Sequence, residues 1–390
     1  MPRPEYATPE TPSHRRLRVF QVIGQLKRGG REFQMVQLVG GLMARGVEVK
    51  VVAFFGGPWL EVLNNELKVS VEIIHPHLIR VPALLRRFRA WQPDVVHTHL
   101  GPANLYGRIA GRLARVPAVI AQEGNDGTEK SMVRSTIDRI LARWCDRVII
   151  NNQRGVDGYA RLGVPRQIMR VVPNGMDVEG IASAASPAAR ELLPFGNDTI
   201  VIGTVGRLSA QKNHMLLMET FKKLQGKHPH LRLVIVGDGA LRTKLERFAA
   251  ELDITDKLYM AGQVKDAYRF AAAFDIFVLS SNYEGQSNAL IECMMVGTPA
   301  VVTNAGGNRE LIDHERSGLV VPLKDSDALA TAIERMLEDR SQARKWSQVA
   351  RDYARSQFSI EALTNNVLAL YREVLESKGG WSPAWTSLIR

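Results

Sequence analysis

The sequence predicts an α/β protein with two Rossmann-like, doubly wound domains that face a central cleft. Two observations indicate this fold class. In both halves of the chain, short apolar runs that suit buried strands alternate with helix-like segments, as is typical of parallel sheets covered by helices. A segment rich in Ala, Ser and Pro interrupts this alternation at residues 172–197. The 390 residues suit two domains of ordinary size.

The first half is expected to form an N-terminal domain at residues 17–178, after a flexible tail at 1–16. Apolar runs predict its strands at Leu17–Ile23, Val47–Phe55, Val69–Ile74, Asp94–Thr98, Ala118–Gln122 and Arg147–Asn151. The segments between them predict helices at Glu32–Arg45, Pro82–Trp91, Ala103–Ala114 and Met132–Arg143.

The second half repeats the same logic after a linker expected at 179–197. It predicts a C-terminal domain at 198–360, with strands at Thr199–Val205, Arg232–Val236, Lys257–Met260, Ile276–Ser280, Ala300–Thr303 and Gly318–Val321. A last helix is expected at Ile360–Glu376. The segment 361–390, with its two tryptophans, is expected to pack back toward the N-terminal domain.

Composition places the chain among globular proteins, with 45% hydrophobic and 23% charged residues. Its two cysteines, Cys145 and Cys293, are far apart and lie in apolar surroundings, which indicates buried thiols rather than a disulfide. Residues 1–17 lack the apolar run of a signal peptide, and no run of 18 apolar residues exists. A cytoplasmic protein is therefore expected, which could still lie on a membrane surface.

Positive charge is concentrated in the first half of the chain. Residues 1–178 hold 26 Lys and Arg against 15 Asp and Glu, whereas residues 179–390 hold 25 of each. The whole net charge of +11 therefore lies in residues 1–178. It is either a solvated basic surface or a surface for a polyanion such as acidic lipid, a lipid diphosphate or nucleic acid. Aromatic residues make up only 7% and no stacking motif accompanies the basic helices, which argues against nucleic acid.

The motif with the most chemistry joins two carboxylates, Glu284 and Glu292, across the start of a helix. Ser287 and Asn288 are typical N-cap residues, so Glu284 is expected in a loop and Glu292 about one turn into the helix. A helix N-terminus offers N–H groups to phosphate, and carboxylates accept hydrogen bonds from sugar and ribose hydroxyls. The alternative is two glutamates that face solvent.

A second motif places Arg207 and Lys212 on the turn after a strand, where the two cations can hold a diphosphate. Exposed surface cations are the alternative. Paired glycines, Gly29 and Gly30, follow the first strand and would allow a ligand to approach the backbone closely. Gly237 and Gly239 follow a later strand, where an ordinary strand-to-helix turn is the alternative.

Two histidines, His97 and His99, end a strand on the expected cleft side. No third metal ligand accompanies them, so the alternative to a binding role is two histidines that cap a strand end. The pair Asp325 and Asp327 precedes a helix and is interpreted as capping rather than as a metal site. No metal and no cofactor are expected.

These motifs resemble those of glycosyltransferase family 4, over roughly residues 17–375 and most specifically in the second half. Glu284 to Glu292 is similar to the family's E-x7-E signature, and it continues through Gly297-Thr-Pro and Gly306-Gly307-Asn-Arg-Glu310. Arg207 to Lys212 is similar to G-R-L-x-x-x-K-N. The elements GG-x-E, G-x-G and D-x-V-H-x-H are matched at Gly29, Gly237 and Asp94. At Glu123 the chain departs from the family, because many members carry a histidine there.

The resemblance implies the GT-B fold and a role for each matched residue. Glu292 would bind the donor ribose and Glu284 the donor sugar, while Arg207 and Lys212 would neutralise the leaving diphosphate. The catalytic set is then Arg207, Lys212 and Glu284. The donor-binding set is Gly29, Gly30, Gly237, Gly239, Val264, Gly285, Gln286, Ser287, Asn288, Ala289, Leu290 and Glu292. His97, His99 and Glu123 are the acceptor-side candidates.

The implied reaction is sugar transfer, with retained configuration, from a nucleoside diphosphate sugar to a lipid-linked or saccharide acceptor in polysaccharide, lipopolysaccharide or glycolipid synthesis. A UDP-sugar is favoured over GDP-mannose. An epimerase or phosphorylase of the same fold is one alternative, and a catalytically silent subunit that binds a nucleotide sugar or a membrane is another.

Arginines on three helix-like segments predict a peripheral site on the inner face of the cytoplasmic membrane. They alternate with Leu84, Leu85, Phe88 and Trp91 on the first segment. The arginines are Arg80, Arg86, Arg87 and Arg89, then Arg108, Arg112 and Arg115, then Arg134, Arg139 and Arg143. The alternative is that the apolar residues face the domain core and the arginines face solvent.

Overall fold

The structure, a computed structural model, describes residues 15–27, 29–75, 77–123, 136, 139–196 and 198–389. These residues divide into two compact units. The first lies within Met1–Glu123, Thr136–Ile149 and Thr364–Arg390, and the second lies within Gly124–Ser135 and Ile150–Leu363.

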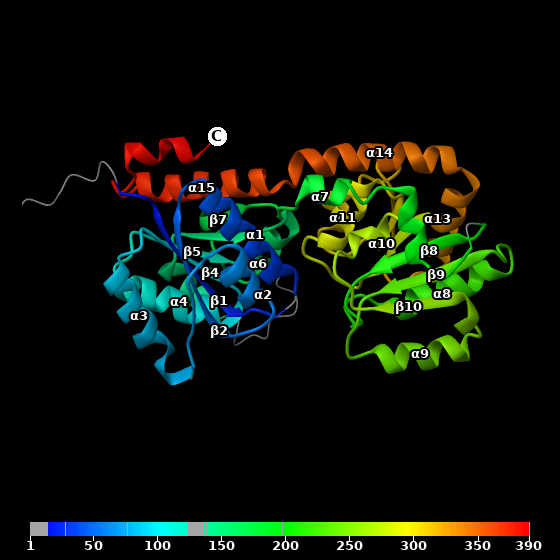
Figure 1. The fold of residues 1–390 in the computed structure, drawn as a ribbon, viewed down its shortest axis with the longest axis horizontal. Coiled ribbons are helices and arrows are strands. Elements are labelled where there is room, and N and C mark those ends of the chain that lie inside the picture. The colour runs from blue at the N-terminus through cyan, green and yellow to red at the C-terminus, as the bar shows by residue number, and fades with distance from the viewer. Residues whose placement is uncertain are drawn as a thin grey trace, which may run out of the picture. The chain divides into compact units, whose positions relative to one another are not determined.

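The first sheet is parallel and has the order β3-β2-β1-β4-β5-β6-β7. Its strands are β1 (Arg18–Gln25), β2 (Glu48–Phe55), β3 (Val71–Ile73), β4 (Val95–His99), β5 (Ala118–Gln122), β6 (Arg147–Ile150) and β7 (Met169–Val171). The helices along this part of the chain are α1 (Gly30–Ala44), α2 (Trp59–Glu61), α3 (Arg80–Trp91), α4 (Gly101–Leu113) and α6 (Gln153–Arg161). Figure 1 shows these elements in blue to green.

The second sheet is also parallel, in the order β10-β9-β8-β11-β12-β13. Its strands are β8 (Ile200–Val205), β9 (Leu231–Val236), β10 (Leu258–Gly262), β11 (Ile276–Leu279), β12 (Ala300–Thr303) and β13 (Leu319–Val321). The helices from here to the end of the chain are α7 (Val178–Ala182), α8 (His214–Gln225), α9 (Arg242–Glu251), α10 (Tyr268–Ala271), α11 (Asn288–Val296), α12 (Asn308–Leu311), α13 (Ser326–Glu338), α14 (Arg340–Gln357) and α15 (Ile360–Glu376).

Each sheet has one point where the strand order reverses. In the first it lies between β1 and β4, and in the second between β8 and β11. Right-handed connections on either side of such a point place helices on opposite faces and leave a crevice outside the carboxyl ends of the two strands, where ligands of this architecture bind. A ligand site of the second unit is therefore expected at the loops that follow β8 and β11.

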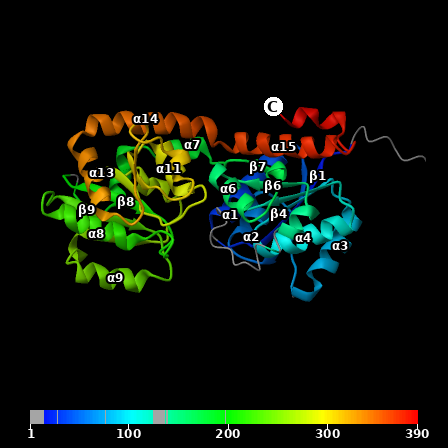
Figure 2. The same cartoon turned by 180° about the vertical axis from the view of Figure 1, so that it is seen from behind.

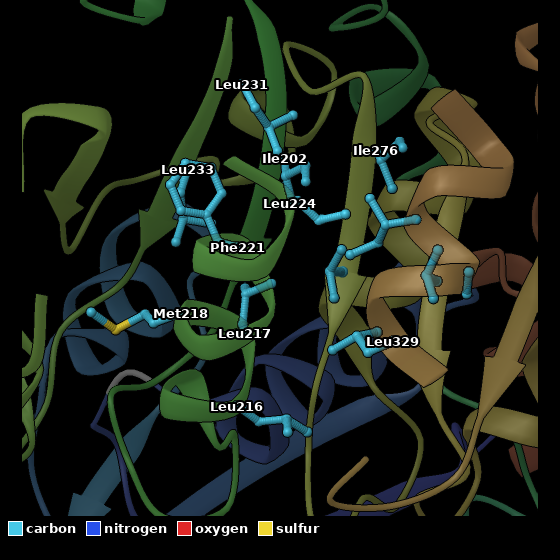
Figure 3. Close-up of a cluster of buried hydrophobic side chains, with 14 of the residues drawn as sticks. Ile202, Leu216, Leu217, Met218, Phe221, Leu224, Leu231, Leu233, Ile276 and Leu329 are labelled. Carbon is cyan, nitrogen blue, oxygen red and sulfur yellow. The ribbon is translucent and has the colours of Figure 1, made fainter. Parts of the chain in front are cut away.

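The core of the second unit is built where α8 meets the sheet. Leu217 and Phe221 of α8 are fully buried against strand residues such as Leu233 (Figure 3). The spacing of Leu217, Phe221 and Leu224 along α8 puts all three on one face of the helix. This packing fixes the position of β8 and of the loop that leaves it.

The C-terminal segment contacts other parts of the first unit. Within that unit, Arg147 Nη2 is 2.6 Å from Glu373 Oε1 and Lys378 Nζ is 2.7 Å from Asp146 Oδ1. Trp385 donates its indole N–H to the backbone oxygen of Arg15 at 2.6 Å. Both views show α15 running beside the strands of the first sheet (Figures 1 and 2).

Several sequence-based expectations need correction. The three-residue strand β7 and the helix α6 were not predicted, and the expected linker contains α7 and a 3-10 turn at Pro187–Leu192. The expected tail at 1–16 lies mostly outside the described residues. Half of the helix expected at Met132–Arg143 also lies outside them, including Arg134. Cys145 and Cys293 are free and buried, as predicted.

The amphipathic interpretation of the helix now called α3 is wrong in part. Leu84 and Phe88 are 0% and 1% exposed, so the apolar side of this helix packs into the core and does not face a bilayer. Arg80 and Arg108 are buried as well, and Arg80 packs over the ring of Phe54. Arg86, Arg89, Arg115, Arg139 and Arg143 are exposed. No helix in the described part of the chain is long and apolar enough to cross a bilayer.

Candidate functional site

The loops that follow β8 and β11 contact each other at the reversal point of the second sheet. Asn282 donates its backbone N–H to Gln211 O at 2.8 Å, and Ser280 Oγ donates to Lys212 O at 3.0 Å. These bonds hold the loop that carries Arg207 and Lys212 against the loop that carries Glu284. Residues from two separate sequence motifs therefore meet at one place.

Glu284 is 6% exposed, and its carboxylate has three partners. Oε1 accepts hydrogen bonds from Lys212 Nζ at 2.5 Å and from Ser281 Oγ at 2.7 Å, and Gln211 Nε2 is 3.4 Å from Oε2. A carboxylate this far from water needs such partners, because an unpaired buried charge is costly. Glu284 is thus not the solvent-facing glutamate that the sequence left open.

The two cations differ in their surroundings. The side chain of Lys212 is 13% exposed, and its stem lies over Gly206, where an added Cβ would be 3.1 Å from Lys212 Cε. Arg207 is exposed, and its backbone oxygen is 3.2 Å from His214 Nε2. Lys212 is therefore fixed in the site, whereas Arg207 has a side chain that can move toward a ligand.

Glycines at the points where the loops of this site meet have no side chain, so the backbones can approach each other closely. A Cβ on Gly306 would lie 1.6 Å from Glu284 O, and one on Gly307 would lie 2.2 Å from Gly285 O. Likewise, a Cβ on Gly237 would lie 2.0 Å from Gly206 O. Gly306 and Gly237 also have φ values of +49° and +135°, where glycine is favoured.

The close approach of Gly237 to Gly206 involves one of two glycines, Gly237 and Gly239, that were predicted to bind the donor. A Cβ on Gly239 would lie 2.5 Å from Leu208 O, so both Gly237 and Gly239 shape the loop that carries Arg207. Close backbone packing is enough to explain these glycines. Their direct contact with a donor stays a prediction.

Helix α11 begins at the site without a side-chain cap. Ser287 is its N-cap residue but makes no capping hydrogen bond, and its hydroxyl oxygen is buried without a partner in the structure. Gln286 and Asn288 on either side bond to Asn174, a contact that the sequence did not predict. Gly285, Ala289 and Leu290 complete this turn. The positive end of the helix dipole is therefore open to an anion.

Glu292 lies one turn into α11 and is half-buried. Burial, with a smaller contribution from the negative charge of Asp266, raises the pKa of Glu292 to about 7. Asp266 lies two residues after Val264 in the loop that follows β10. Glu292 can accordingly gain or lose its charge near neutral pH.

In the first unit, Gly29 and Gly30 form the start of α1 after β1. Gly29 is the N-cap residue, and a Cβ there would lie 2.4 Å from Glu32 Oε2. Glu32 is 8% exposed and its Oε1 accepts a hydrogen bond from Gln25 Nε2 at 3.0 Å. The absence of a side chain at Gly29 thus gives the carboxylate room at the helix N-terminus.

His97 and His99 of β4 are fully buried, so neither side chain is exposed at the end of the strand. Their rings stack with centroids 4.4 Å apart. His97 Nδ1 is 2.7 Å from Tyr371 Oη, and His99 Nε2 is 2.6 Å from Gln21 Oε1. Burial, with the charge of Arg31, lowers the pKa of His97 to about 3 and the pKa of His99 well below its usual range. Both rings are therefore neutral at physiological pH.

Glu123, the third acceptor-side candidate, is 4% exposed. Its Oε1 accepts hydrogen bonds from Asn104 Nδ2 at 2.8 Å and from Arg108 Nη2 at 3.2 Å. The ion pair with Arg108 explains why that arginine can be buried.

Metal ligation finds no support in the described ranges. No group of three or more His, Cys, Asp or Glu side chains there is arranged to hold a metal ion. Asp325 caps α13, as the sequence predicted, by accepting hydrogen bonds from the backbone N–H groups of Asp327 and Ala328. Gln211, which contacts Glu284, was missed because nothing in its local sequence indicates a contact across about 70 residues. Ser281 lies three residues before Glu284 and was missed because no motif includes it.

Comparison with known proteins assigns both halves of the chain. Residues 28–179 match the model of Glycosyltransferase Family 4, and residues 186–353 match that of Glycosyl transferases group 1. An Escherichia coli UDP-Gal:alpha-D-GlcNAc-diphosphoundecaprenol alpha-1,3-galactosyltransferase is 31% identical over 259 residues, covering 63% of this chain and 67% of the relative. The lipopolysaccharide core biosynthesis glycosyltransferase LpsE of Rhizobium meliloti is 29% identical over 251 residues, covering 64% and 68%.

Solved structures give the same fold. HepE of Anabaena, in complex with UDP and glucose, has a TM-score of 0.82 at 21% identity, over 93% of this chain and 100% of that one. The lipopolysaccharide outer core galactosyltransferase WaaB has a TM-score of 0.71 at 15% identity, over 93% and 100%. With its two parallel sheets and both family matches, the chain belongs to glycosyltransferase family 4 and has the GT-B fold.

Proposed function

We propose that this glycosyltransferase moves a sugar from a nucleoside diphosphate donor to an acceptor hydroxyl with retention of the anomeric configuration. The observation that carries the proposal is the meeting of Lys212 and Glu284 where the strand order of the second sheet reverses. A cation there can hold the diphosphate, and a carboxylate can accept hydrogen bonds from sugar hydroxyls. The carboxyl ends of strands at such a point are the usual ligand site of doubly wound sheets.

The donor is a UDP-sugar rather than GDP-mannose in this proposal. The Escherichia coli relative is named for UDP-Gal, and HepE was solved with UDP and glucose, which supports uridine as the base. Glu292 accepts hydrogen bonds from the ribose hydroxyls and Glu284 from the sugar. Gly29, Gly30 and Val264 stay in the donor-binding set as predictions.

Rate enhancement comes mainly from stabilising the leaving diphosphate. The ammonium of Lys212 has three N–H groups and uses one toward Glu284, so two remain for phosphate oxygens. Arg207 can add a bidentate contact, and the uncapped start of α11 adds backbone N–H groups. All three are already positive before the bond to the sugar breaks.

Retention is assigned to attack on the same face from which the diphosphate leaves. As the bond from the anomeric carbon to the phosphate oxygen breaks, the acceptor oxygen bonds to that carbon and its proton passes to the departing phosphate. Glu284 is a poor nucleophile for a covalent route, because Lys212 and Ser281 already bind its Oε1. This geometry favours a sugar-binding role for the carboxylate.

The acceptor is proposed to be lipid-linked or a saccharide. The Escherichia coli relative is named for a diphosphoundecaprenol-linked acceptor, and LpsE is named for lipopolysaccharide core biosynthesis. His97, His99 and Glu123 stay acceptor-side candidates, and because all three are buried they would act by shaping the site.

An anionic membrane surface is the proposed partner of the basic first half, at the inner face of the cytoplasmic membrane. The arginines that support this are the exposed ones, Arg86, Arg89, Arg115, Arg139 and Arg143. Since Leu84 and Phe88 are buried, the attraction is electrostatic and does not involve the apolar side of α3.

The experiment that tests the proposed function is a panel of nucleotide sugars, first by thermal shift and then by turnover. Each donor that stabilises the protein is incubated with lipid-linked acceptors, and the anomeric configuration of the product is read by NMR. Donor stabilisation without transfer to any acceptor would favour the silent-subunit alternative. Conversion of the donor without an acceptor would favour an epimerase.

A further inference from the structure

The segment Val172-Pro-Asn-Gly175 begins the stretch 172–197, which interrupts the alternation of strands and helices in the sequence, yet in the structure it is held on two sides. Both of its neighbours belong to the second unit, as the segment itself does. One is the turn that enters α11, and the other is the junction between α14 and α15. A linker without a further role would not need buried polar contacts.

Asn174 makes the contact with the turn that enters α11. Its backbone N–H donates to Gln286 Oε1 at 2.6 Å, and its side-chain Nδ2 donates to Asn288 Oδ1 at 2.7 Å. The same Nδ2 lies 3.4 Å from Gln286 O. Because Asn174 is 5% exposed, these bonds are shielded from water, and losing them would leave buried polar groups unpaired.

The residues after Asn174 hold the segment on its other side. Met176 donates its backbone N–H to Phe358 O at 2.7 Å and accepts one from Ile360 at 3.1 Å. A Cβ on Gly175 would lie 2.8 Å from Leu363 Cβ, so only glycine fits there without a shift. The hydrogen bonds of Met176 and the close packing of Gly175 therefore hold the backbone next to Asn174 in place.

The contact has a direct consequence at the start of α11. The side chain of Asn288 bonds to Asn174, and Gln286 is held through its side-chain oxygen and lies close to Asn174 through its backbone oxygen. Ser287 lies between the two held residues, with its hydroxyl oxygen unpartnered and the helix N-terminus uncapped. Asn174 thus fixes the two residues on either side of Ser287, at the helix N-terminus where an anion can bind.

We infer that Asn174 is a positioning residue of the donor site, which acts through Gln286 and Asn288 to hold the start of α11 ready for the diphosphate. The inference rests on the proposed function, since it assigns this turn to the donor. Asn174 itself does not touch the reacting atoms.

The test compares Asn174→Ala with the parent by calorimetric titration with UDP and with GDP. Asn174→Ala removes the two interactions that Nδ2 makes with the turn, along with the contact of Oδ1 with Asn151. It should weaken binding of the nucleotide that the parent prefers by about tenfold, the size of one or two net hydrogen bonds. Asn151→Ala is the matched control, because Asn151 is also buried and its Nδ2 lies 3.5 Å from Asn174 Oδ1, while its hydrogen bonds in the described residues go to Asn174 and Asn152 and not to the turn. It should leave nucleotide affinity within twofold of the parent.

A structural role alone would lower the melting temperature of both variants and leave nucleotide affinity unchanged in both, which would overturn the inference. If Asn174→Ala does not fold, Asn174→Leu gives the same readout, because leucine has a similar branched shape, adds no charge and removes both bonds that Nδ2 donates. A double-mutant cycle with Asn288→Ala should show that the two losses in affinity are not additive. Additive losses would contradict action through Asn288.

The outcome also separates this inference from the proposed function. If the parent binds neither UDP nor GDP, the proposed donor function fails and the inference fails with it. If the parent binds a nucleotide and a folded Asn174→Ala binds it equally well, only the inference fails.

Discussion

Lys212 Nζ lies 2.5 Å from Glu284 Oε1 and joins the loop after β8 to the loop after β11. The two side chains are 13% and 6% exposed, and Ser281 adds a hydrogen bond to the same carboxylate oxygen. A buried pair of this kind leaves an uncompensated charge when one partner is removed. The contact therefore links the proposed chemistry of Lys212 to the stability of the site.

We predict different results for the two cations of this site. Arg207→Ala should lower turnover by roughly 10²–10³, the usual cost of removing one group that stabilises charge in the transition state, with little change in melting temperature because Arg207 is exposed. Lys212→Ala should lower turnover similarly and also destabilise the protein by about 1–3 kcal/mol, because Glu284 loses its cation. Steady-state kinetics and thermal unfolding check both. Near-normal turnover in the two variants would contradict the proposed diphosphate clamp.

Glu292 should make donor binding depend on pH. Its pKa is raised to about 7, so the carboxylate that accepts from the ribose is lost as the pH falls through 7, and affinity for UDP should fall with it. Glu292→Gln should weaken binding by about 1.5–3 kcal/mol at pH 8 and remove this part of the pH dependence. Titration calorimetry between pH 6 and 8.5 measures both effects.

Asp266→Asn provides the control for this pH effect. Removing the negative charge of Asp266 should move the midpoint of the pH dependence to lower pH, because that charge helps to raise the pKa of Glu292. Identical pH profiles for the parent and Glu292→Gln would show that Glu292 does not bind the nucleotide.

Gly306 should tolerate no side chain. Gly306→Ala places a Cβ 1.6 Å from Glu284 O at a φ of +49°, so the loop of Glu284 must move. We expect a loss of stability of roughly 1–3 kcal/mol or more, together with a fall in turnover. Gly226→Ala is the control, because nothing lies within 4 Å of its Cβ, and it should change stability by less than about 1 kcal/mol. Equal melting temperatures of the two variants would refute this role of Gly306.

The membrane proposal predicts binding to acidic vesicles that fades as salt rises and is absent with neutral lipid. Exchanging Arg86 and Arg89 for glutamate should weaken this binding by at least about tenfold, since each arginine near an anionic surface contributes about 1 kcal/mol. Arg344 and Lys345, exposed on α14 of the second unit, provide a double variant of the same net charge. Vesicle sedimentation that finds both double variants equally impaired would remove α3 as the contact.

The sequence was sufficient for most of the architecture, for a physical reason. Strands such as β8 and β12 are largely apolar because both faces of a parallel sheet are covered, and such runs can be recognised locally. The three-residue strand β7, by contrast, contains Arg170 between two apolar residues and carries no periodic signal.

The sequence indicated individual residues of the site, but it did not indicate which of them contact each other. The motifs indicated Glu284 and Lys212 separately, whereas their hydrogen bond depends on how β8 and β11 lie side by side. For the same reason the contact of Asn174 with Gln286 could not be predicted, because the two residues are 112 positions apart. The burial of Leu84 and Phe88 on α3, and the burial of Arg108, likewise depend on neighbours that are distant in the sequence.

We propose that Lys212 and Glu284 hold a nucleoside diphosphate sugar, from which the protein transfers the sugar with retention of configuration. The most direct measurement is turnover of a UDP-sugar with a lipid-linked acceptor, with the product's anomeric configuration read by NMR, for the parent and for Glu284→Gln. We expect a product with the same configuration as the donor, and a large loss of turnover in the variant at unchanged fold. An inverted product, or equal turnover by the parent and Glu284→Gln, would contradict this proposal.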